Sequence, residues 1–113
     1  MAYEIREEHG YQVVQLTGDV DLSRSPAARK TILQCLKERR DVLVDLSRVS
    51  YIDSSGVASL VEGFQTAKKQ NLQFGLIGVS EAAMAVLRLA RLDRVFEIHA
   101  SVDERAAARG ANG

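Results

Sequence analysis

The segment Asp53-Ser54-Ser55-Gly56 carries the residues of this sequence that are best suited to regulatory chemistry. A serine hydroxyl can accept a phosphoryl group, which adds about −1.5 to −2 charges at neutral pH. The segment leads into the apolar periodicity of a helix, so unpaired backbone N–H groups and the positive end of the helix dipole lie next to Ser54. Asp53 beside it would repel an added phosphate, as would Asp19 or Asp21 from an earlier turn. Ser54 is therefore a candidate phosphorylation site, at which a phosphate would change the charge of the surrounding surface.

The same spacing also fits a simpler role for Ser54, that of a helix N-cap. A serine at the N-cap satisfies an unpaired backbone N–H group, and the helix dipole would also stabilise Asp53. Spacing alone favours the cap slightly over the switch. Ser55 falls inside the first turn, and Ser59 is expected on a solvated face of the helix. Gly56 would permit another chain to approach the start of the helix.

The elements that must position this segment are short strands that alternate with amphipathic helices. Strands are predicted at residues 11–16, 42–46 and 72–77, with a weaker strand at 3–6 and a last one at 95–98. A turn at His9-Gly10 predicts that the first two strands form an antiparallel hairpin. The later strand–helix–strand order implies right-handed parallel crossovers. We therefore expect an α/β fold with a small, mixed and mostly parallel β-sheet, an N-terminal hairpin and about four helices.

The helices are defined by their caps and by their apolar spacing. The first is predicted to begin with Ser25 as N-cap and Pro26 at its first position, and to end near residue 37 or 38. The second runs from just past Ser54 to the lysines at 68 and 69, and the third is capped by Ser80. Gly63 lies inside the second helix, where close packing is the usual reason for a glycine. The residues expected to face inward are Ile32, Cys35, Leu36, Val57, Leu60, Val61, Phe64, Ala83, Val86, Leu87 and Ala90.

The composition is that of one small domain. The chain has 113 residues, of which 46% are hydrophobic and 27% are charged. The formal net charge is +0, which makes a nucleic-acid partner unlikely because such binding depends on excess positive charge. The lone Cys35 is expected to be buried in a reducing compartment. With neither a signal peptide nor a membrane-spanning run, we expect a cytoplasmic protein without direct membrane insertion.

The sequence shows no constellation typical of an enzyme. The serines at 54 and 55 do not lie in a Gly-x-Ser-x-Gly elbow, and there is no glycine-rich phosphate loop or zinc-ligand spacing. His9 and His99 are expected to be solvated. Asp53 could be the acceptor of a phospho-aspartate receiver, but the acidic pair expected after a first parallel strand is missing. We therefore expect a binding domain without catalytic residues, metal or cofactor.

Three elements of the sequence resemble the STAS domain when they are taken together. They are Gly18-Asp19-Val20-Asp21 after a strand, Val44-Asp45-Leu46-Ser47 at the end of a strand, and Ile52-Asp53-Ser54-Ser55-Gly56-Val57 opening a helix. Within that family the pattern is most similar to the bacterial anti-sigma factor antagonists. The resemblance implies one STAS domain over residues 1–113, with a core from about residue 3 to about residue 106 and a frayed tail at 107–113. It also shifts the interpretation of Ser54 from cap to switch.

The resemblance implies a non-enzymatic protein that regulates transcription by partner switching. Such a domain binds an anti-sigma factor with serine kinase activity while it is unphosphorylated, and phosphorylation of the serine matching Ser54 ends the complex. The kinase would bring the ATP and Mg²⁺. The implied docking surface is the turn from residue 18 to residue 25 and the start of the second helix. The implied partner-binding residues are Asp19, Asp21, Ser23, Asp53, Ser54, Ser55 and Gly56.

A second group within the same family is an alternative. Ala58 stands where many members have a second glycine, and Ser59 stands where an aliphatic residue is frequent. Residues 45–50 and 67–70 are also similar to the cytoplasmic STAS subunits of ABC-type phospholipid transport systems. An ABC transporter ATPase is therefore the alternative partner. A phosphatase and a homodimer are further partners that the sequence leaves open.

Overall fold

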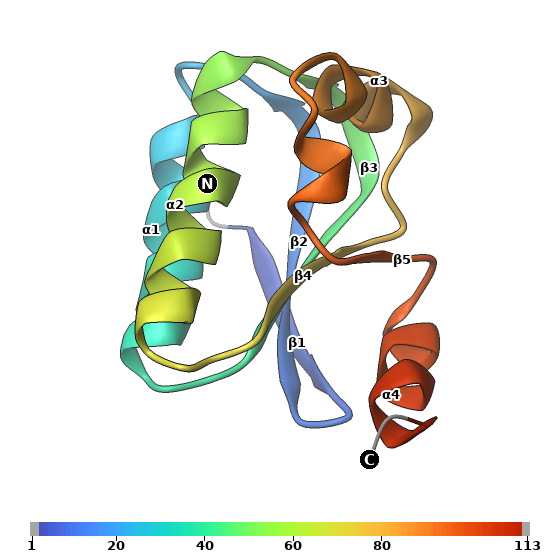
Figure 1. The fold of residues 1–113 in the computed structure, drawn as a ribbon. Helices are drawn as coiled ribbons and strands as arrows, with labels where there is room; N and C mark the ends of the chain where they lie inside the picture. Colours follow the sequence, from blue (N-terminus) through green and yellow to red (C-terminus); the bar gives the residue numbers. More distant parts are fainter. Residues whose placement is uncertain (1–2, 112–113) are drawn as a thin grey trace.

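A five-stranded sheet in the order β1-β2-β3-β4-β5 forms the centre of the computed structural model, which describes residues 3–111 (Figure 1). The strands β1 and β2 form the predicted antiparallel hairpin, and every later neighbour in the sheet is parallel. The α/β class and the mostly parallel sheet are therefore confirmed. The strands are β1 (Glu4–Glu8), β2 (Tyr11–Val20), β3 (Val42–Ile52), β4 (Phe74–Ile77) and β5 (Ile98–His99).

The helices cover the two faces of the sheet unequally. One face carries α1, α2 and α3, whose apolar sides share the main core with the sheet, and α1 lies beside α2 (Figure 1). The other face carries α4, which closes a smaller cluster through Val102. The helices are α1 (Ser25–Lys37), α2 (Ser54–Lys69), α3 (Glu81–Leu89) and α4 (Val102–Ala111), with a 3-10 turn at Leu92–Arg94.

The central strands are buried on both faces because their side chains alternate between the two clusters. Val14 and Val44 point into the main core, whereas Val13 and Leu43 belong to the smaller cluster. All four side chains are fully buried, as expected for parallel strands with helices on both faces. Cys35 is buried as predicted.

Each strand differs from its predicted bounds at one end or both, and the differences are large in β2, β3 and β5. The third strand continues past Leu46 to Ile52 because β2 is also long and pairs with it through register shifts. Asp19 consequently lies inside β2, opposite Tyr51, and not in a turn. The last strand is limited to Ile98–His99, since the backbone before it is held in the 3-10 turn by hydrogen bonds to the Leu92 carbonyl.

The predictions for α1 and α3 were each wrong at one end. Ser25 is the first residue of α1 and Arg24 is its N-cap, because the Asp21 carbonyl accepts the Ser25 N–H at 2.7 Å. Ala90 is exposed, since α3 ends at Leu89. The tail expected to fray from residue 107 is helical up to Ala111, and residues 112–113 lie outside the described part of the chain.

Candidate functional site

Two turns meet at the carboxyl-terminal ends of β2 and β3. The backbone N–H of Asp53, just after β3, donates to the carbonyl of Val20 at the end of β2, at 3.3 Å. The turn from β2 into α1 therefore lies beside the turn from β3 into α2. The edge of a sheet at which parallel strands end is where α/β proteins commonly place binding and regulatory sites.

Asp53, and not Ser54, is the N-cap of α2. Its Oδ1 accepts hydrogen bonds from the Ser55 N–H at 2.9 Å, the Ser55 hydroxyl at 2.5 Å and the Gly56 N–H at 3.2 Å. The hydroxyl of Ser55, followed by backbone N–H groups that include that of Leu22, lowers the pKa of the Asp53 carboxyl. The aspartate takes the cap because its extended backbone places a carboxylate directly below the first N–H groups of the helix.

The three serines of this segment differ in what their hydroxyl groups do. Ser54 is exposed as the first residue of α2, and its side chain makes no hydrogen bond within residues 3–111. Ser55 is half-buried and donates to Asp53. Ser59, expected on a solvated face, is buried because its hydroxyl donates to the carbonyls of Ser25 at 3.3 Å and Ser55 at 3.2 Å. Ser54 therefore presents the free hydroxyl of this segment.

Asp21 orders the turn that leads into α1. Its Oδ1 accepts hydrogen bonds from the Ser23 N–H at 3.1 Å, the Ser23 hydroxyl at 2.8 Å and the Arg24 N–H at 3.1 Å. Its Oδ2 accepts from Nη1 of Arg24 at 3.2 Å. The Ser23 hydroxyl is the main cause that lowers the pKa of Asp21. The carboxylate and Ser23 thus shape the turn, which leaves Leu22 exposed at its tip.

Gly56 lets the first turn of α2 rest on the end of β2. A Cβ atom at this position would lie 2.6 Å from the Val20 carbonyl oxygen and 2.7 Å from Cγ1 of Ile52. Gly56 is buried, so the close approach expected from another chain is made by the protein's own strands. The glycine therefore sets how closely the start of α2, including Ser54, approaches the edge of the sheet.

Two exposed apolar side chains at this edge were missed by sequence reasoning. Leu22 is 76% exposed and Tyr51 is 52% exposed, opposite the exposed Asp19. The sequence signal for Leu22 was that it is the only apolar residue among residues 21–24. Tyr51 gave no such signal, because its exposure depends on the extension of β3 beyond the predicted strand.

A family model described as the STAS domain matches residues 2–105. The chain belongs to the STAS domain family. The anti-sigma-B factor antagonist of Bacillus subtilis (strain 168) is 25% identical over 86% of this chain and 89% of its own length. A counterpart of the same name from Listeria monocytogenes is 24% identical over 87% of this chain and 88% of its own.

Solved structures share the fold of this STAS domain. An anti-sigma-factor antagonist (STAS) domain protein from Planctomyces limnophilus superposes with a TM-score of 0.82 at 23% identity, covering 96% of this chain and 97% of its own. The phosphorylated form of the Bacillus cell fate determinant SpoIIAA has a TM-score of 0.72 at 18% identity, covering 95% and 98%. At these identities the likeness concerns the fold alone.

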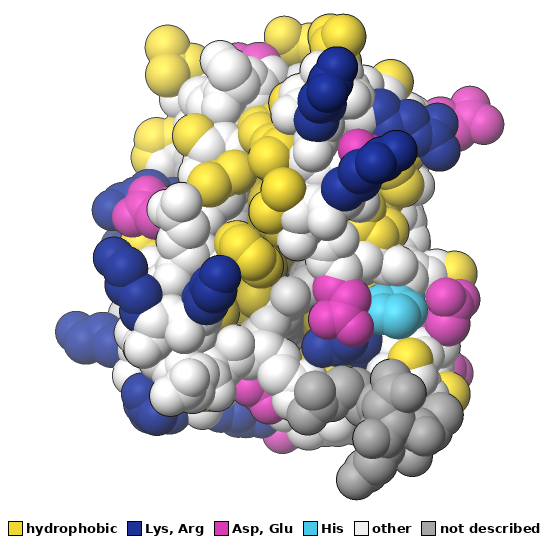
Figure 2. All heavy atoms as spheres, in the orientation of Figure 1, with side chains coloured by type: hydrophobic (Ala, Val, Ile, Leu, Met, Phe, Trp, Pro, Cys, Tyr) yellow, Lys and Arg dark blue, Asp and Glu magenta, His cyan; other side chains and the backbone are white. Residues whose placement is uncertain are grey.

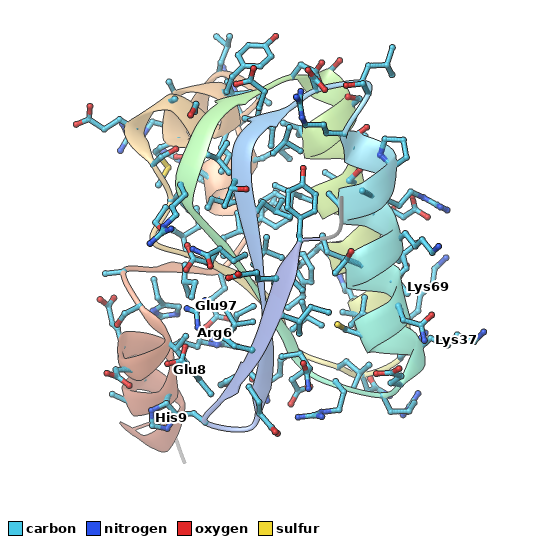
Figure 3. The ribbon with its side chains drawn as sticks, turned by 180° about the vertical axis from the view of Figure 1, so that it is seen from behind. Arg6, Glu8, His9, Lys37, Lys69 and Glu97 are labelled. Carbon is cyan, nitrogen blue, oxygen red and sulfur yellow. The ribbon has the colours of Figure 1, made fainter. Side chains whose placement is uncertain are left out.

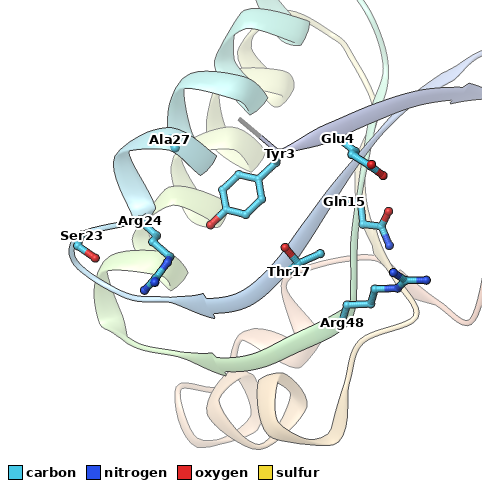
Figure 4. A pocket seen from close by; sticks show the side chains of 8 residues that line it. All are labelled: Tyr3, Glu4, Gln15, Thr17, Ser23, Arg24, Ala27 and Arg48. Atoms are coloured by element: carbon cyan, nitrogen blue, oxygen red, sulfur yellow. The ribbon is translucent and has the colours of Figure 1, made fainter. Parts of the chain in front are cut away.

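The STAS domain also has a polar hollow of about 510 Å³ behind the turn that Asp21 orders (Figure 4). Tyr3 and Arg24 converge on one side of it, whereas Arg48 lies across from them (Figure 4). The Tyr3 hydroxyl is buried there without a hydrogen-bond partner among the described residues, and burial raises its pKa. Ser23 and Arg24 line the hollow, so the turn that Asp21 orders forms part of its wall.

Several titratable residues form ion pairs near α4, and the view from behind shows Arg6, Glu8, His9 and Glu97 on the side of the sheet next to this helix (Figure 3). His9 in the hairpin turn lies 2.8 Å from Asp103, and Arg105 contacts Glu97. His99, expected to be solvated, has a side chain only 15% exposed because Glu97 and Glu104 flank it. No group of His, Cys, Asp and Glu in the described chain could hold a metal ion. None of its helices combines the length and apolar character needed to span a bilayer.

The N-cap formed by Asp53 leads to a prediction about how the stability of this STAS domain depends on pH. Because hydrogen bonds lower the folded-state pKa of Asp53 below 3.8, its ionised form stabilises the fold above that pH, and the stabilisation is lost as the pH falls through the folded-state pKa. We expect Asp53→Asn to lower the free energy of unfolding at pH 7 and to lower it less at pH 3. Urea unfolding of both proteins at each pH measures this. An equal loss at the two pH values would contradict the assigned cap.

Proposed function

We propose that this chain is an anti-sigma factor antagonist that acts by partner switching in the cytoplasm. Unphosphorylated, it binds an anti-sigma factor that has serine kinase activity; phosphorylated on Ser54, it is released. The whole chain acts as one STAS domain over residues 1–113, without a catalytic role or cofactor of its own. Relatives named anti-sigma-B factor antagonists support the proposal, as does the fold shared with the unphosphorylated and phosphorylated forms of SpoIIAA.

The observation that carries the proposal is that Asp53 caps α2 while the neighbouring Ser54 is exposed. Asp53 is the N-cap of the helix, so the Ser54 hydroxyl takes no part in capping and is exposed at the helix start. A kinase can reach such a hydroxyl without unfolding α2. Because the cap role belongs to Asp53, it no longer competes with the switch role that we propose for Ser54.

The same arrangement explains why a phosphate would oppose binding. The N–H groups of Ser55 and Gly56 already donate to Asp53, so they are not free to receive a phosphate on Ser54. The added charge would lie beside the Asp53 carboxylate and face the partner. Placing about two uncompensated negative charges in an interface opposes binding through desolvation and repulsion.

The docking surface that we propose combines the two turns at the sheet edge. Asp21 and Ser23 contribute through the turn they order, while Leu22 and Tyr51 offer exposed apolar area. Ser54 lies on the neighbouring turn. Aromatic and apolar anchors surrounded by polar groups are typical of protein interfaces. The remaining proposed partner-binding residues are Asp19, Asp53, Ser55 and Gly56.

Affinity purification of the tagged chain from its native cell tests the proposed partner. We expect recovery of one chain that binds ATP and phosphorylates serine, and loss of that chain when the Ser54→Asp variant is used as bait. Circular dichroism of both baits controls for folding. Recovery from membranes of an ABC transporter ATPase with both baits would contradict partner switching and favour the phospholipid-transport alternative.

A further inference from the structure

An apolar groove of about 740 Å³ runs between α2 and α3 on the helical face of the domain. Figure 2 shows it as an apolar strip with Lys and Arg side chains on both sides. Its lining is Ser54, Val57, Ala58, Val61, Glu62, Gln65, Val86, Leu89 and Ala90, and we call it the α2–α3 groove. Because the lining of α2 runs from residue 54 to residue 65, Ser54 lies at one end of the groove.

On the α3 side of this groove, the last residue of the helix is an exposed leucine, Leu89. Leu89 is 88% exposed, although Leu87, two residues earlier in the same helix, is completely buried. Val86 and Leu89 are three residues apart, so they form one stripe along the groove. An exposed leucine beside a continuous apolar lining provides an anchor for an apolar side chain of a partner.

The charges around the groove point to an acidic occupant. Glu62, the acidic residue of the lining, is already neutralised by Arg29, whose guanidinium donates to both carboxylate oxygens at 2.7 and 2.8 Å. In contrast, five exposed cations near the lining, at the end of α2, on α3 and in the turn that follows α3, form no ion pair with a described side chain. Asp93 is the acidic residue in the same stretches, residues 66–69 and 87–94. These cations are Lys68, Lys69, Arg88, Arg91 and Arg94.

We propose that the α2–α3 groove binds an amphipathic helix with acidic flanks that belongs to the same partner that docks at Ser54. The proposal rests on the proposed function, because the groove begins at Ser54. Ser54 also belongs to the proposed docking surface of the two turns, which we call the switch surface. A helix laid in a groove inserts apolar residues at i, i+3, i+4 and i+7 while its flanks meet the rim. Acidic flanks match the unpaired cations.

A second copy of this chain fits the groove less well. In a two-fold dimer the same patch meets itself, so the unpaired cations of α2 and α3 would face one another across the interface. Like charges placed opposite each other oppose association. An acidic helix from a different chain removes that repulsion.

A phosphate on Ser54 would also weaken the binding of the acidic helix in the groove. A phosphate at one end of the groove would place about −1.5 to −2 charges beside the acidic helix. The neutral serine lets the helix extend over the start of α2, whereas the phosphoserine repels its acidic flank. One modification would therefore weaken both the switch surface and the groove.

Site-directed photo-crosslinking in the native cell tests the occupant. p-Benzoylphenylalanine replaces Leu89 in the groove or, in a matched variant, Leu22 at the switch surface, and both positions are exposed. We expect both variants to capture the same partner chain. Sequencing of the adduct should show that position 89 is joined to a segment with helical apolar spacing and flanking Asp or Glu.

The other outcomes separate the groove from the proposed function. An adduct at position 22 without one at position 89 would overturn the groove and leave the partner switch standing. An adduct of position 89 with a second copy of this chain would also overturn it. If neither position captured a partner, both proposals would be contradicted.

Binding measurements with the purified partner give the quantitative test. Leu89→Ser should raise the Kd at least tenfold because it removes an exposed anchor without touching the core, and Arg91→Glu should raise it further at low salt. Ile5→Ser is the matched control, since Ile5 is 47% exposed on β1 and lies outside the groove. An unchanged Kd for Leu89→Ser would overturn the groove.

Discussion

Ser54→Asp should weaken the binding of this chain to its partner by roughly a hundredfold or more, which corresponds to about 3 kcal/mol. The carboxylate would lie beside Asp53, whose own charge is held by the cap hydrogen bonds, and it would be desolvated without a counterion when the partner docks. The fold should not suffer, because an acidic residue in the first turn of a helix is favourable to the helix dipole. Isothermal titration calorimetry with the purified partner measures the change.

Ser54→Asn is the matched control for this experiment. Asparagine has nearly the shape of aspartate but carries no charge, so the variant should bind within a fewfold of the wild type. Equal loss with Asn and Asp would show that the surface senses shape and not charge. Unchanged affinity with Asp would contradict the switch.

Gly56→Ala should have the largest effect on stability, lowering the free energy of unfolding by about 2 kcal/mol or more. The added methyl group would lie 2.6 Å from the Val20 carbonyl oxygen, and a strand backbone cannot move aside as a flexible side chain can. The start of α2 would have to lift from the sheet, and Ser54 would move with it. Denaturant unfolding measures the loss, and the same protein should also bind its partner less tightly.

Ala58→Gly measures how much an exchange between alanine and glycine changes stability through helix propensity alone, and so serves as the control for Gly56→Ala. Ala58 is exposed in the same helix, so its replacement reports propensity alone, at about 1 kcal/mol. Propensity by itself would make Gly56→Ala stabilising, so the two effects have opposite signs. A Gly56→Ala protein as stable as the wild type would show that the contact with Val20 can relax.

The sequence predicted the strands, the N-terminal hairpin and the mostly parallel sheet, because hydrophobic periodicity depends on neighbours along the chain. The hairpin at His9-Gly10 and the parallel strands after it are confirmed. The packing role expected for Gly63 is also confirmed, since a Cβ there would lie 2.8 Å from both Ile32 and Phe74.

Details that depend on tertiary contacts were not predictable in the same way. Ser59 looked solvated from its position in α2, but the carbonyl of Ser25 on the neighbouring helix accepts its hydrogen bond. Ala90 continued the apolar spacing of α3, but the chain turns at Arg91, which has a φ of 60°. Both errors arose because spacing along one helix does not show where a second helix lies or where the first one ends.

The candidate site was only partly predictable for a related reason. Asp53 and Ser54 are adjacent acceptors before the same helix, and either could cap it by spacing alone. The backbone conformation at Asp53 decides between them. The contribution of Leu22 at the sheet edge is equally a matter of three-dimensional placement, because the polar turn around it is ordered by Asp21.

Mapping the phosphate by mass spectrometry, after incubation of the chain with its purified partner, ATP and Mg²⁺, tests the switch at Ser54 most directly. We expect one phosphate, on Ser54, which is lost in Ser54→Ala and retained in Ser55→Ala, because the hydroxyl of Ser55 is bound to Asp53. A phosphate on Ser55 or Ser59, or a bound partner that transfers none to Ser54, would contradict it.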